Sequence, residues 1–445
     1  MQIVIPMSGF GERFRKAGYT TPKPLIEING KPIIQYVVEM FPDETNFIFI
    51  CNKEHLYLAK YRMEEILKKI APLGKIIAIE PHDKGPVYAV LQAIEHLDLN
   101  EPTIVNYADF TCYWDYADFK KMVVDTGCEG AIPCYRGFHP HTIWSNYYAY
   151  VREINLTALD IEEKKPFTNN PQKEYASSGT YYFKNGNLLR QYFEKCVKEK
   201  LLVNNEYYVS MVYKPMIVEG LNIRIYKLQH FMQWGTPIDL EEYRYWSKSF
   251  SLILNNQSPP THKGNVLLPM VGLGSRFKKE GYKTPKPFIK VSGKPMVLQA
   301  LTDLPLAENK RIILRKDLPD LTSFNKKLNE EKNKTEYFVL DHITDGQATT
   351  CVEGSNGLNQ NIPVTIGACD NGMKYSAKEF TKLIDSDKVD IIVWGARGYP
   401  GAIRSPKMYG WIDADKQTGK IKNVSVKKQL NDPINDPIIV GTFTF

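Results

Sequence analysis

The residues best suited to chemistry lie near the start of the chain. Gly9 and Gly11 follow an apolar run at 3–5 that is typical of a buried parallel strand. Glycines separated by one residue allow the backbone to turn sharply and to bring its amide N–H groups close to a bound anion. Arg13 and Lys23 add two cations beside that turn. A strand, a glycine turn and two cations together indicate a site for a triphosphate.

The spacing of these glycines excludes two common phosphate-binding motifs. A dinucleotide fold requires a third glycine three residues after Gly11, where Phe14 stands, and no P-loop string occurs in the chain. The string instead resembles the signature of the sugar-nucleotidyltransferase superfamily, Gly-x-Gly-x-Arg followed after a short spacer by Pro-Lys-Pro-Leu. That resemblance implies an α/β nucleotidyltransferase domain in which Met7 and Ser8 join the two glycines around the nucleotide.

Composition narrows the class of protein. The 445 residues are 43% hydrophobic and 24% charged, which is ordinary for a globular protein of two or three domains. No apolar run approaches the roughly 18 residues of a membrane span, and the first residues lack the pattern of a signal peptide. The seven cysteines show no Cys-x-x-Cys spacing, so we expect reduced thiols in a cytoplasmic protein. The net charge of +7 forms no basic block, which fits small anionic substrates and not nucleic acid.

The opening motif occurs twice. Residues 269–277 repeat residues 6–14, and Lys286 repeats Lys23 at the same offset of 263 positions. A duplication explains this match. We therefore predict two tandem Rossmann-like, GT-A-like nucleotidyltransferase domains with mixed, mainly parallel sheets, at 1–254 and 265–445, joined by a linker at 255–264. The counterparts of site residues in the second copy are Gly272, Gly274, Arg276, Lys286, Asp341, Gly346 and Asp370.

The second copy is expected to be incomplete at its carboxyl end. Phe445 aligns with Phe183, so the sequence holds no second counterpart of 184–246. The closing residues, 438–445, have the pattern of a buried strand.

Strand and helix signals alternate in the first copy. This order predicts a sheet with helices on both faces and ligands at the carboxyl ends of the strands. The expected strands are 46–51, 75–79, 103–106, 147–152, 176–183 and 222–228. The expected helices are 55–70, 87–97, 116–125, 188–200 and 207–219.

Two carboxylates are candidates for a magnesium site. Asp109 follows the expected strand 103–106, where the resemblance places a metal-binding Asp, although an isolated Asp there could equally cap a helix. The segment 233–240 resembles the family's closing motif. Many members carry an Asp two residues before its Gly-Thr, but this chain has Gln233. Asp239 is then the second candidate, with the alternative that it is an N-terminal helix residue.

The acceptor's phosphate is expected at Lys164 and Lys165, because Glu-Lys-Lys-Pro resembles the superfamily's Glu-Lys-Pro motif, although such a charge run can also be a solvated turn. Gly179, in Ser-Ser-Gly-Thr, is a further family landmark. Arg136 and His139, in Arg-Gly-Phe-His-Pro, resemble transferases found with bacterial capsule and surface-polysaccharide genes. That subset includes cytidylyltransferases that activate non-sugar phosphates. His139 also has a plain alternative as a surface residue.

The base of the nucleotide is expected at the loop from Glu80 to Gly85. In thymidylyl- and uridylyltransferases of the superfamily, a Gln commonly occupies the position of Glu80 and reads uracil or thymine. A carboxylate cannot donate to a carbonyl, but it accepts from the exocyclic amine of cytosine. The sequence therefore favours CTP, unless Glu80 merely faces solvent at the rim of the loop.

The implied reaction is magnesium-dependent attack of a phosphomonoester on the α-phosphorus of a nucleoside triphosphate. The attacking group is already anionic at neutral pH, so no general base is required, and Arg13 and Lys23 would be the catalytic cations. Two alternatives remain. A glycosyltransferase would need Asp-x-Asp at the metal-binding strand, whereas Asp413-Ala-Asp415 is expected to form a hairpin turn. The second copy could be a non-catalytic partner, and a homo-oligomer stays open.

Overall fold

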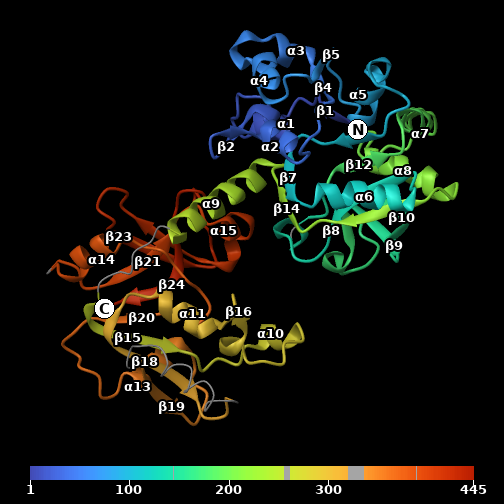
Figure 1. Cartoon of the computed structure of the whole chain (residues 1–445). Helices are drawn as coiled ribbons and strands as arrows, with labels where there is room; N and C mark the ends of the chain where they lie inside the picture. The colour runs from blue at the N-terminus through green and yellow to red at the C-terminus, as the bar shows by residue number, and fades with distance from the viewer. Residues whose placement is uncertain (144, 255–260, 319–334, 387) are drawn as a thin grey trace. The chain divides into compact units, whose positions relative to one another are not determined.

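The chain divides into two compact units, Met1–Arg244 and Tyr245–Phe445 (Figure 1). A computed structural model describes residues 1–143, 145–254, 261–318, 335–386 and 388–445. The division falls inside helix α9 (Pro237–Leu254), before the predicted domain end at 254. The predicted linker lies partly outside the described residues, and its last residues belong to strand β15 (His262–Pro269). None of the described helices is both long and apolar enough to cross a membrane.

The first unit is built on a ten-stranded sheet with β1 between β6 and β4. β1 is buried along nearly all of its length, as expected of a central parallel strand. In order across the sheet, the strands are β11 (Tyr175–Ser177), β9 (Ala149–Ile154), β10 (Thr157–Glu163), β13 (Ile223–Lys227), β8 (Gly130–Tyr135), β12 (Thr180–Phe183), β6 (Thr103–Asn106), β1 (Gln2–Met7), β4 (Phe47–Asn52) and β5 (Lys75–Ile79).

Only part of this sheet is parallel. The neighbours β5, β4, β1 and β6 are parallel, as are β8 and β13, whereas the other pairings are antiparallel. β9 and β10 form a hairpin whose turn residues, Asn155 and Leu156, both have positive φ, as a two-residue hairpin turn requires. The prediction of a mixed α/β sheet is confirmed. The prediction that it is mainly parallel is wrong, because β12 lies antiparallel between β6 and β8 and the strands beyond β13 alternate in direction.

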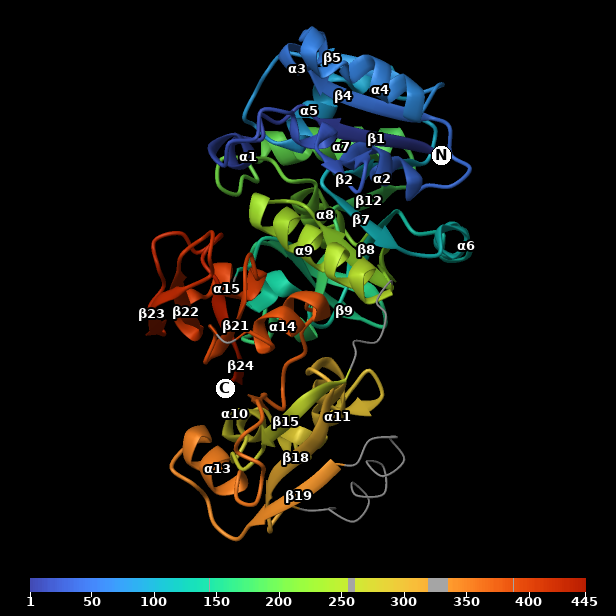
Figure 2. The ribbon, with the colours of Figure 1, turned by 90° about the vertical axis from the view of Figure 1, so that its left-hand side faces the viewer.

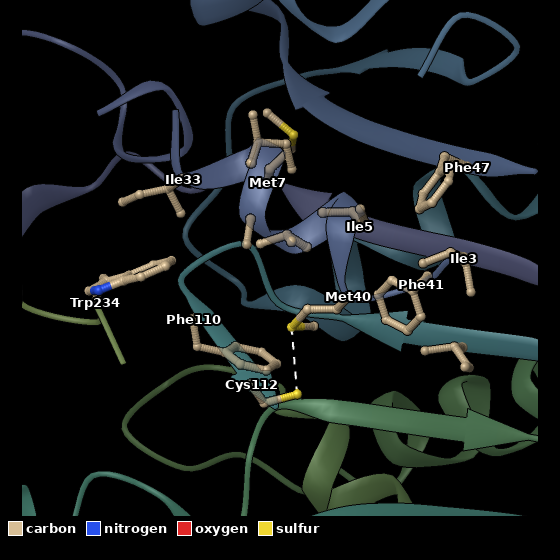
Figure 3. Close-up of a cluster of buried hydrophobic side chains, with 14 of the residues drawn as sticks. Ile3, Ile5, Met7, Ile33, Met40, Phe41, Phe47, Phe110, Cys112 and Trp234 are labelled. Atoms are coloured by element: carbon tan, nitrogen blue, oxygen red, sulfur yellow. Dashed lines mark hydrogen bonds between the residues drawn. The ribbon is translucent and has the colours of Figure 1, made fainter. Parts of the chain in front are cut away.

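Helices cover both faces of the sheet. Successive side chains of β1 point to opposite faces, and because they are apolar on both, each face needs a covering layer. Ile3, Ile5 and Met7 join one core with residues of α2, α4 and α6, which Figure 3 shows in part. Val4 joins the opposite core with residues of α5, α7 and α8. The helices are α1 (Glu12–Lys16), α2 (Ile33–Glu39), α3 (Lys53–Tyr57), α4 (Met63–Ile70), α5 (Pro86–Gln92), α6 (Tyr116–Thr126), α7 (Gly186–Lys198) and α8 (Val209–Val218).

Two small sheets complete the first unit. β7 (Phe110–Tyr113) pairs antiparallel with β14 (His230–Gln233), which brings the residue after Asp109 opposite Gln233. β2 (Glu27–Ile28) and β3 (Lys31–Pro32) follow a short 3-10 turn, η1 (Lys23–Leu25). The pairing of β7 with β14 therefore links the two segments that carry the candidate carboxylates.

Most predicted elements of the first unit are present, and the exceptions have local causes. The predicted strands 46–51, 75–79 and 103–106 are found as β4, β5 and β6. The predicted helix 55–70 is two helices, because Arg62 adopts a left-handed conformation (φ 47°) between them. The predicted strand 176–183 is broken in the same way at Gly179 (φ 102°). The predicted helix 87–97 ends at Gln92 and continues as a 3-10 turn, Ile94–His96.

The second unit repeats the strand pairings around β1. Its main sheet has the order β19-β18-β15-β20-β24-β22-β23, with β21 beside β24. β15 is parallel to β18 and β20, and β24 is antiparallel to β20, as β12 is to β6. Figure 2 shows β15, β18 and β19 side by side. The elements are β15, α10 (Ser275–Lys279), η6 (Lys286–Phe288), β16 (Lys290–Val291), β17 (Lys294–Pro295), α11 (Met296–Asp303), β18 (Ala307–Arg315), β19 (Thr335–Leu340), α13 (Gln347–Gly354), β20 (Val364–Ile366), α14 (Ala377–Ile384), β21 (Ile392–Ala396), α15 (Pro400–Arg404), β22 (Gly410–Ala414), β23 (Ile421–Val426) and β24 (Ile438–Thr444).

Two predictions for the second copy concern these strands. The predicted strand at 438–445 is found as β24, which lies between β20 and β22. The predicted hairpin at Asp413-Ala-Asp415 is also found, since β22 pairs antiparallel with β23 and the Asp415 amide donates to the Lys420 carbonyl at 2.9 Å.

Candidate functional site

The glycine turn follows β1 directly. Gly11 has φ +66°, a left-handed conformation that favours glycine, and it caps the start of α1. Gly9 lies outside that region, and a Cβ built on it would meet no atom within 4 Å. The turn therefore needs only Gly11 for its conformation, while Gly9 leaves open space beside the backbone.

The loop between β1 and α1 is held by the core and by a side chain of β4. The Met7 side chain points into the core, so its backbone alone is available to a ligand (Figure 3). The Asn52 side chain, at the end of β4, donates to the Ser8 carbonyl at 3.3 Å. Packing and this hydrogen bond hold the backbone between β1 and α1 in place before any ligand binds.

Lys23 joins this loop to the end of β6. A Cβ built on Gly11 would lie 3.8 Å from the Lys23 Cβ, so the lysine stem packs against the turn. The Lys23 ammonium donates to Asp109 Oδ2 at 2.7 Å and to the Gly235 carbonyl at 3.1 Å. The Lys23 and Asp109 side chains are 19% and 33% exposed, which leaves the ion pair accessible to a ligand. The structure thus brings the glycine turn and Lys23 to Asp109 and Gly235, which lie far away in the sequence.

A second carboxylate faces the same point. A Cβ built on Gly235 would lie 3.6 Å from Asp109 Oδ2 and 3.9 Å from Asp239 Oδ2. Asp239 is buried, and its Oδ2 accepts from the amide and the hydroxyl of Thr236 at 3.1 and 2.7 Å. Thr236 Oγ1 in turn accepts from the Asp239 amide, which makes a capping box at the start of α9. Asp239 therefore caps the start of α9, which is one of the two roles considered from the sequence. It also lies close to Asp109, as the other role requires.

The oxygens around Gly235 fit a magnesium ion held jointly with a ligand. Protein sites of this kind bind Mg²⁺ through one or two carboxylates, and substrate phosphates complete the shell. Gln233 adds a buried Oε1 that has no hydrogen-bond partner among the described residues. The described part of the chain holds no group of three or more His, Cys, Asp or Glu residues that could hold a metal. The residues present therefore fit magnesium bound with a phosphate chain and not magnesium bound alone.

Lys164 provides a cation at another edge of the site. It follows β10 in a left-handed conformation (φ +60°), and its amide donates to the Tyr148 carbonyl at 3.0 Å. Its ammonium donates to the Tyr208 hydroxyl at 2.6 Å. Burial lowers the pKa of Lys164, neighbouring glutamates oppose that shift, and the Arg13 charge adds to it. Lys165, in contrast, is exposed.

Sequence reasoning left unassigned a buried carboxyl beside Lys164. Glu163 is only 9% exposed, and its Oε2 accepts from Ser210 Oγ at 2.7 Å. Burial raises the pKa of Glu163 to about 7, while the Ser210 hydrogen bond and the Lys164 charge lower it. The signal was available, because adjacent glutamates on a strand point to opposite faces and one of them must turn inward.

Tyr148 is a second residue that the sequence did not single out. Its hydroxyl would lie 3.7 Å from a Cβ built on Gly235, beside both candidate carboxylates. Burial raises its pKa well above the ordinary value, and the charges of Asp109 and Asp239 act in the same direction. Its ring packs against that of Phe231 in β14, with centroids 5.6 Å apart, so its place depends on a residue that is distant in sequence.

The remaining acceptor candidates differ in where they lie. Gly179 has φ +102°, and a Cβ there would lie 3.1 Å from the rings of Tyr107 and Phe110, so it shapes the wall beside Asp109. The His139 ring packs against Phe231, with centroids 5.3 Å apart. Arg136 is exposed, with its guanidinium 5.3 Å from the centroid of the Tyr175 ring. The contacts of Arg136 are therefore with β11 and not with the Lys23–Asp109 pair.

The predicted base loop packs on the segment before α8. Gly85 has φ +88°, and a Cβ there would lie 2.8 Å from the Tyr207 backbone nitrogen. Glu80 is 72% exposed and accepts from the Lys53 ammonium at 2.7 Å. His82, which the sequence analysis did not weigh, has a buried Nε2 with no hydrogen-bond partner in the described chain, and burial lowers its pKa. The loop thus carries two polar groups, the exposed carboxylate of Glu80 and the buried Nε2 of His82.

Comparisons with known proteins concern mainly the first unit. The sequence profile of the family described as "Nucleotidyl transferase" matches residues 3–209. The chain is similar to the bifunctional protein GlmU of Methanocaldococcus jannaschii, 26% identical over 247 residues that cover 54% of this chain and 53% of that protein. It is similar to the mannose-1-phosphate guanylyltransferase catalytic subunit beta of Danio rerio, 28% identical over 251 residues that cover 54% and 62%. This chain thus spans between half and two thirds of the length of these two relatives.

The fold was also compared with solved structures. A nucleoside-diphosphate-sugar pyrophosphorylase from Vibrio cholerae RC9 aligns with 55% of this chain and all of its own, at 20% identity and a TM-score of 0.45.

Proposed function

We propose a function for the chain from the premise that residues 3–209 belong to the nucleotidyl transferase family. The first unit would join a nucleoside triphosphate to a phosphomonoester and release pyrophosphate. The observation that carries this proposal is that the glycine loop packs on Lys23, whose ammonium lies 2.7 Å from Asp109 at the end of β6. Open α/β sheets bind their ligands at this edge. The match of the family profile confirms the superfamily resemblance predicted from the sequence.

The reaction needs positioning and neutralisation of charge. An oxygen of the phosphomonoester attacks the α-phosphorus, the bond from that phosphorus to the bridging oxygen of the β-phosphate breaks, and pyrophosphate leaves. The attacking group is anionic at neutral pH, so no side chain has to remove a proton. The loop amides, Arg13 and Lys23 would hold the triphosphate, and Lys164 would hold the incoming phosphate. Lys164 donates its amide to the carbonyl of Tyr148, whose hydroxyl lies beside both candidate carboxylates, and this supports placing the incoming phosphate next to the nucleotide.

Asp109 and Asp239 would hold Mg²⁺ together with the phosphates of the nucleotide. When bound, the ion neutralises charge that develops on the phosphates. The Lys23 ammonium, 2.7 Å from Asp109 Oδ2, balances the charge of that carboxylate. The carboxylate is therefore held in position before a nucleotide binds.

We extend the proposal to CTP as the donor and to an activated precursor of surface polysaccharide as the product. Glu80 supports CTP, because a carboxylate accepts from the cytosine amine. Its ion pair with Lys53 is exposed, and exposed pairs contribute little, so Glu80 is available to a base. Lys165, Arg136, His139 and Gly179 stay candidates for the acceptor. The Danio rerio relative is named for mannose-1-phosphate, so sugar phosphates belong among the acceptors to be tested.

The first test removes the Lys23 charge. The full chain is assayed for pyrophosphate with each of the four nucleoside triphosphates, Mg²⁺ and a panel of phosphomonoesters. Lys23→Ala should lower kcat/KM by roughly 10²–10³-fold, as loss of a preorganised charged donor does. Lys31→Ala removes an exposed lysine that pairs with Glu39, and it should leave turnover unchanged. Equal turnover in the two variants would contradict the proposal, and a glycosyltransferase would release no pyrophosphate at all.

A second test addresses the base. Glu80→Gln replaces an acceptor by a group that both donates and accepts, which also suits uracil. We expect the preference for CTP over UTP to fall by about tenfold, with little change in the best kcat. If donor preference does not change, Glu80 only faces solvent and the choice of CTP loses its support.

A further inference from the structure

The phosphate-binding half of the first unit has a close counterpart in the second unit, to which the family profile does not extend. β15 leads into a loop in which Gly274 has φ +61° and a Cβ would lie 3.2 Å from the Lys286 Cβ. The corresponding values for Gly11 and Lys23 are +66° and 3.8 Å. Gly272, like Gly9, would meet no atom within 4 Å if a Cβ were built on it. The loop therefore keeps its conformation, its packing on a lysine and its open side.

The ion pair at the end of the neighbouring strand is also preserved. The Lys286 ammonium donates to Asp370 Oδ2, as that of Lys23 does to Asp109. Asp370 follows β20, which pairs in parallel with β15, so it occupies the place of Asp109 after β6. The Lys286 and Asp370 side chains are 23% and 40% exposed, and the pair is therefore as accessible as the first one.

The correspondence continues to the lysine that faces the acceptor. Lys427 has φ +57°, and its amide donates to the Tyr409 carbonyl at 3.0 Å. Lys164 has φ +60° and makes the same bond to Tyr148 at the same distance. A left-handed lysine is costly for a backbone to adopt, so its presence in both units indicates a shared construction beyond the opening motif.

One substitution makes the second loop more cationic. Arg315 stands where the first unit has Asn52, and its guanidinium donates to the Val271 carbonyl at 2.8 Å, as Asn52 does to Ser8. Arg315 is 9% exposed and pairs with Asp317, as Lys286 pairs with Asp370. Arg276, Lys286 and Arg315 thus place three cationic groups around the loop, two of them balanced by aspartates. Their N–H groups are donors of the kind that bind phosphate oxygens.

We propose that the second unit binds a magnesium–nucleoside triphosphate by its phosphates, at Gly272, Gly274, Arg276, Lys286, Arg315 and Asp370. The site is separate from the one in the first unit, and the inference takes from the proposed function the premise that this loop binds phosphates. The chain then carries two nucleotides, one in each unit.

The experiment counts nucleotides bound to the full chain. Equilibrium dialysis against each of the four nucleoside triphosphates, with Mg²⁺ and without any phosphomonoester, should give two bound per chain. Lys286→Met removes the ammonium but keeps most of the stem, and it should weaken one of the two sites by about 10- to 100-fold. Lys23→Met should weaken the other. The double variant should bind no nucleotide at the concentrations used.

Matched controls and circular dichroism separate loss of binding from loss of folding. Lys382→Met removes an exposed lysine of α14 in the same unit and should leave both sites unchanged. One nucleotide bound, lost in Lys23→Met and unaffected by Lys286→Met, would overturn this inference and leave the proposed function intact. Binding lost only in Lys286→Met would support the inference and count against the proposed function.

Discussion

The two units share the glycine loop, the lysine and the aspartate that are proposed to bind phosphates, and they differ in the residues that surround Lys164 and Lys427. In the first unit, Lys164 follows the buried Glu163 and contacts Tyr208. In the second, Lys427 follows Val426, which is 76% exposed. The phosphate loop needs one positive φ, one lysine and one aspartate, and the lysine reaches the aspartate at the end of the neighbouring parallel strand in both units. The acceptor side depends on packing between strands that are distant in sequence, so it diverges more readily after duplication.

The strongest way to break this comparison is to remove the same oxygen from each unit. Asp109→Asn should lower pyrophosphate release by roughly 10²–10³-fold, because the carboxylate charge is what Lys23 and a magnesium ion require. Asp370→Asn makes the same change beside Lys286 and should lower turnover by less than about threefold, while nucleotide binding to the second unit weakens. Initial rates of pyrophosphate release at saturating nucleotide measure both variants.

The contrast between these variants decides whether turnover belongs to one unit or to both. Comparable losses in Asp109→Asn and Asp370→Asn would show that the second unit is also catalytic. Turnover that is unaffected by Asp109→Asn would remove the first unit from the reaction. Circular dichroism of each variant shows that the fold is retained.

A smaller effect should appear in how stability depends on pH. Burial raises the pKa of Glu163 to about 7, from an ordinary value near 4.5. Below the unfolded value both states hold the proton, and the stability from the protonated carboxyl is complete. As pH rises, the unfolded chain loses its proton first, so this stability is lost between about pH 4.5 and 7. The total is up to about 3.5 kcal/mol, because the shift is about 2.5 pKa units and one unit corresponds to about 1.4 kcal/mol.

Substitution of Glu163 tests this window directly. In Glu163→Gln the fall in unfolding free energy between pH 4.5 and 7 should be reduced by that amount, as followed by urea denaturation at several pH values. The Ser210 hydrogen bond lowers the pKa of Glu163, so Ser210→Ala should extend the window to higher pH. Identical pH profiles for the wild-type chain and Glu163→Gln would show that this carboxyl does not titrate in the folded state as expected. Val426 has no titratable group, so the corresponding position of the second unit contributes no such window.

The phosphate side of the site could be read from the sequence because its parts are short strings. Gly11 and Lys23 are close along the chain, and Asp109 follows a strand whose apolar run is plain. The repeat predicts Lys286 at an offset of 263 positions and Asp370 at an offset of 261, and the structure brings each lysine to its aspartate. Apolar runs also predict the strands β4, β5 and β6; β4 and β6 are buried on both faces, and β5 is the partly buried edge strand.

The acceptor side could not be read in the same way. Tyr208 contacts Lys164 across 44 positions. Tyr148 lies beside the carboxylates with its ring against Phe231 of β14, at 5.6 Å between centroids. No local pattern encodes these meetings. The mainly parallel sheet was predicted wrongly for a related reason, since β12 pairs antiparallel with β6 and β8, which are distant from it in sequence.

The smallest effect we expect concerns two glycines that open corresponding helices, Gly85 before α5 and Gly346 before α13. A Cβ on Gly85 would lie 2.8 Å from the Tyr207 backbone, which cannot move without disturbing α8, and φ there is +88°. Gly85→Ala should therefore cost about 1–3 kcal/mol of unfolding free energy. Around Gly346 a Cβ would meet no atom within 4 Å, so Gly346→Ala should cost less than about 1 kcal/mol. Urea denaturation of both variants measures the difference. Equal costs would mean that the close contact with Tyr207 is not what separates the two base loops, and the comparison between the units would then rest on Lys164 and Lys427 alone.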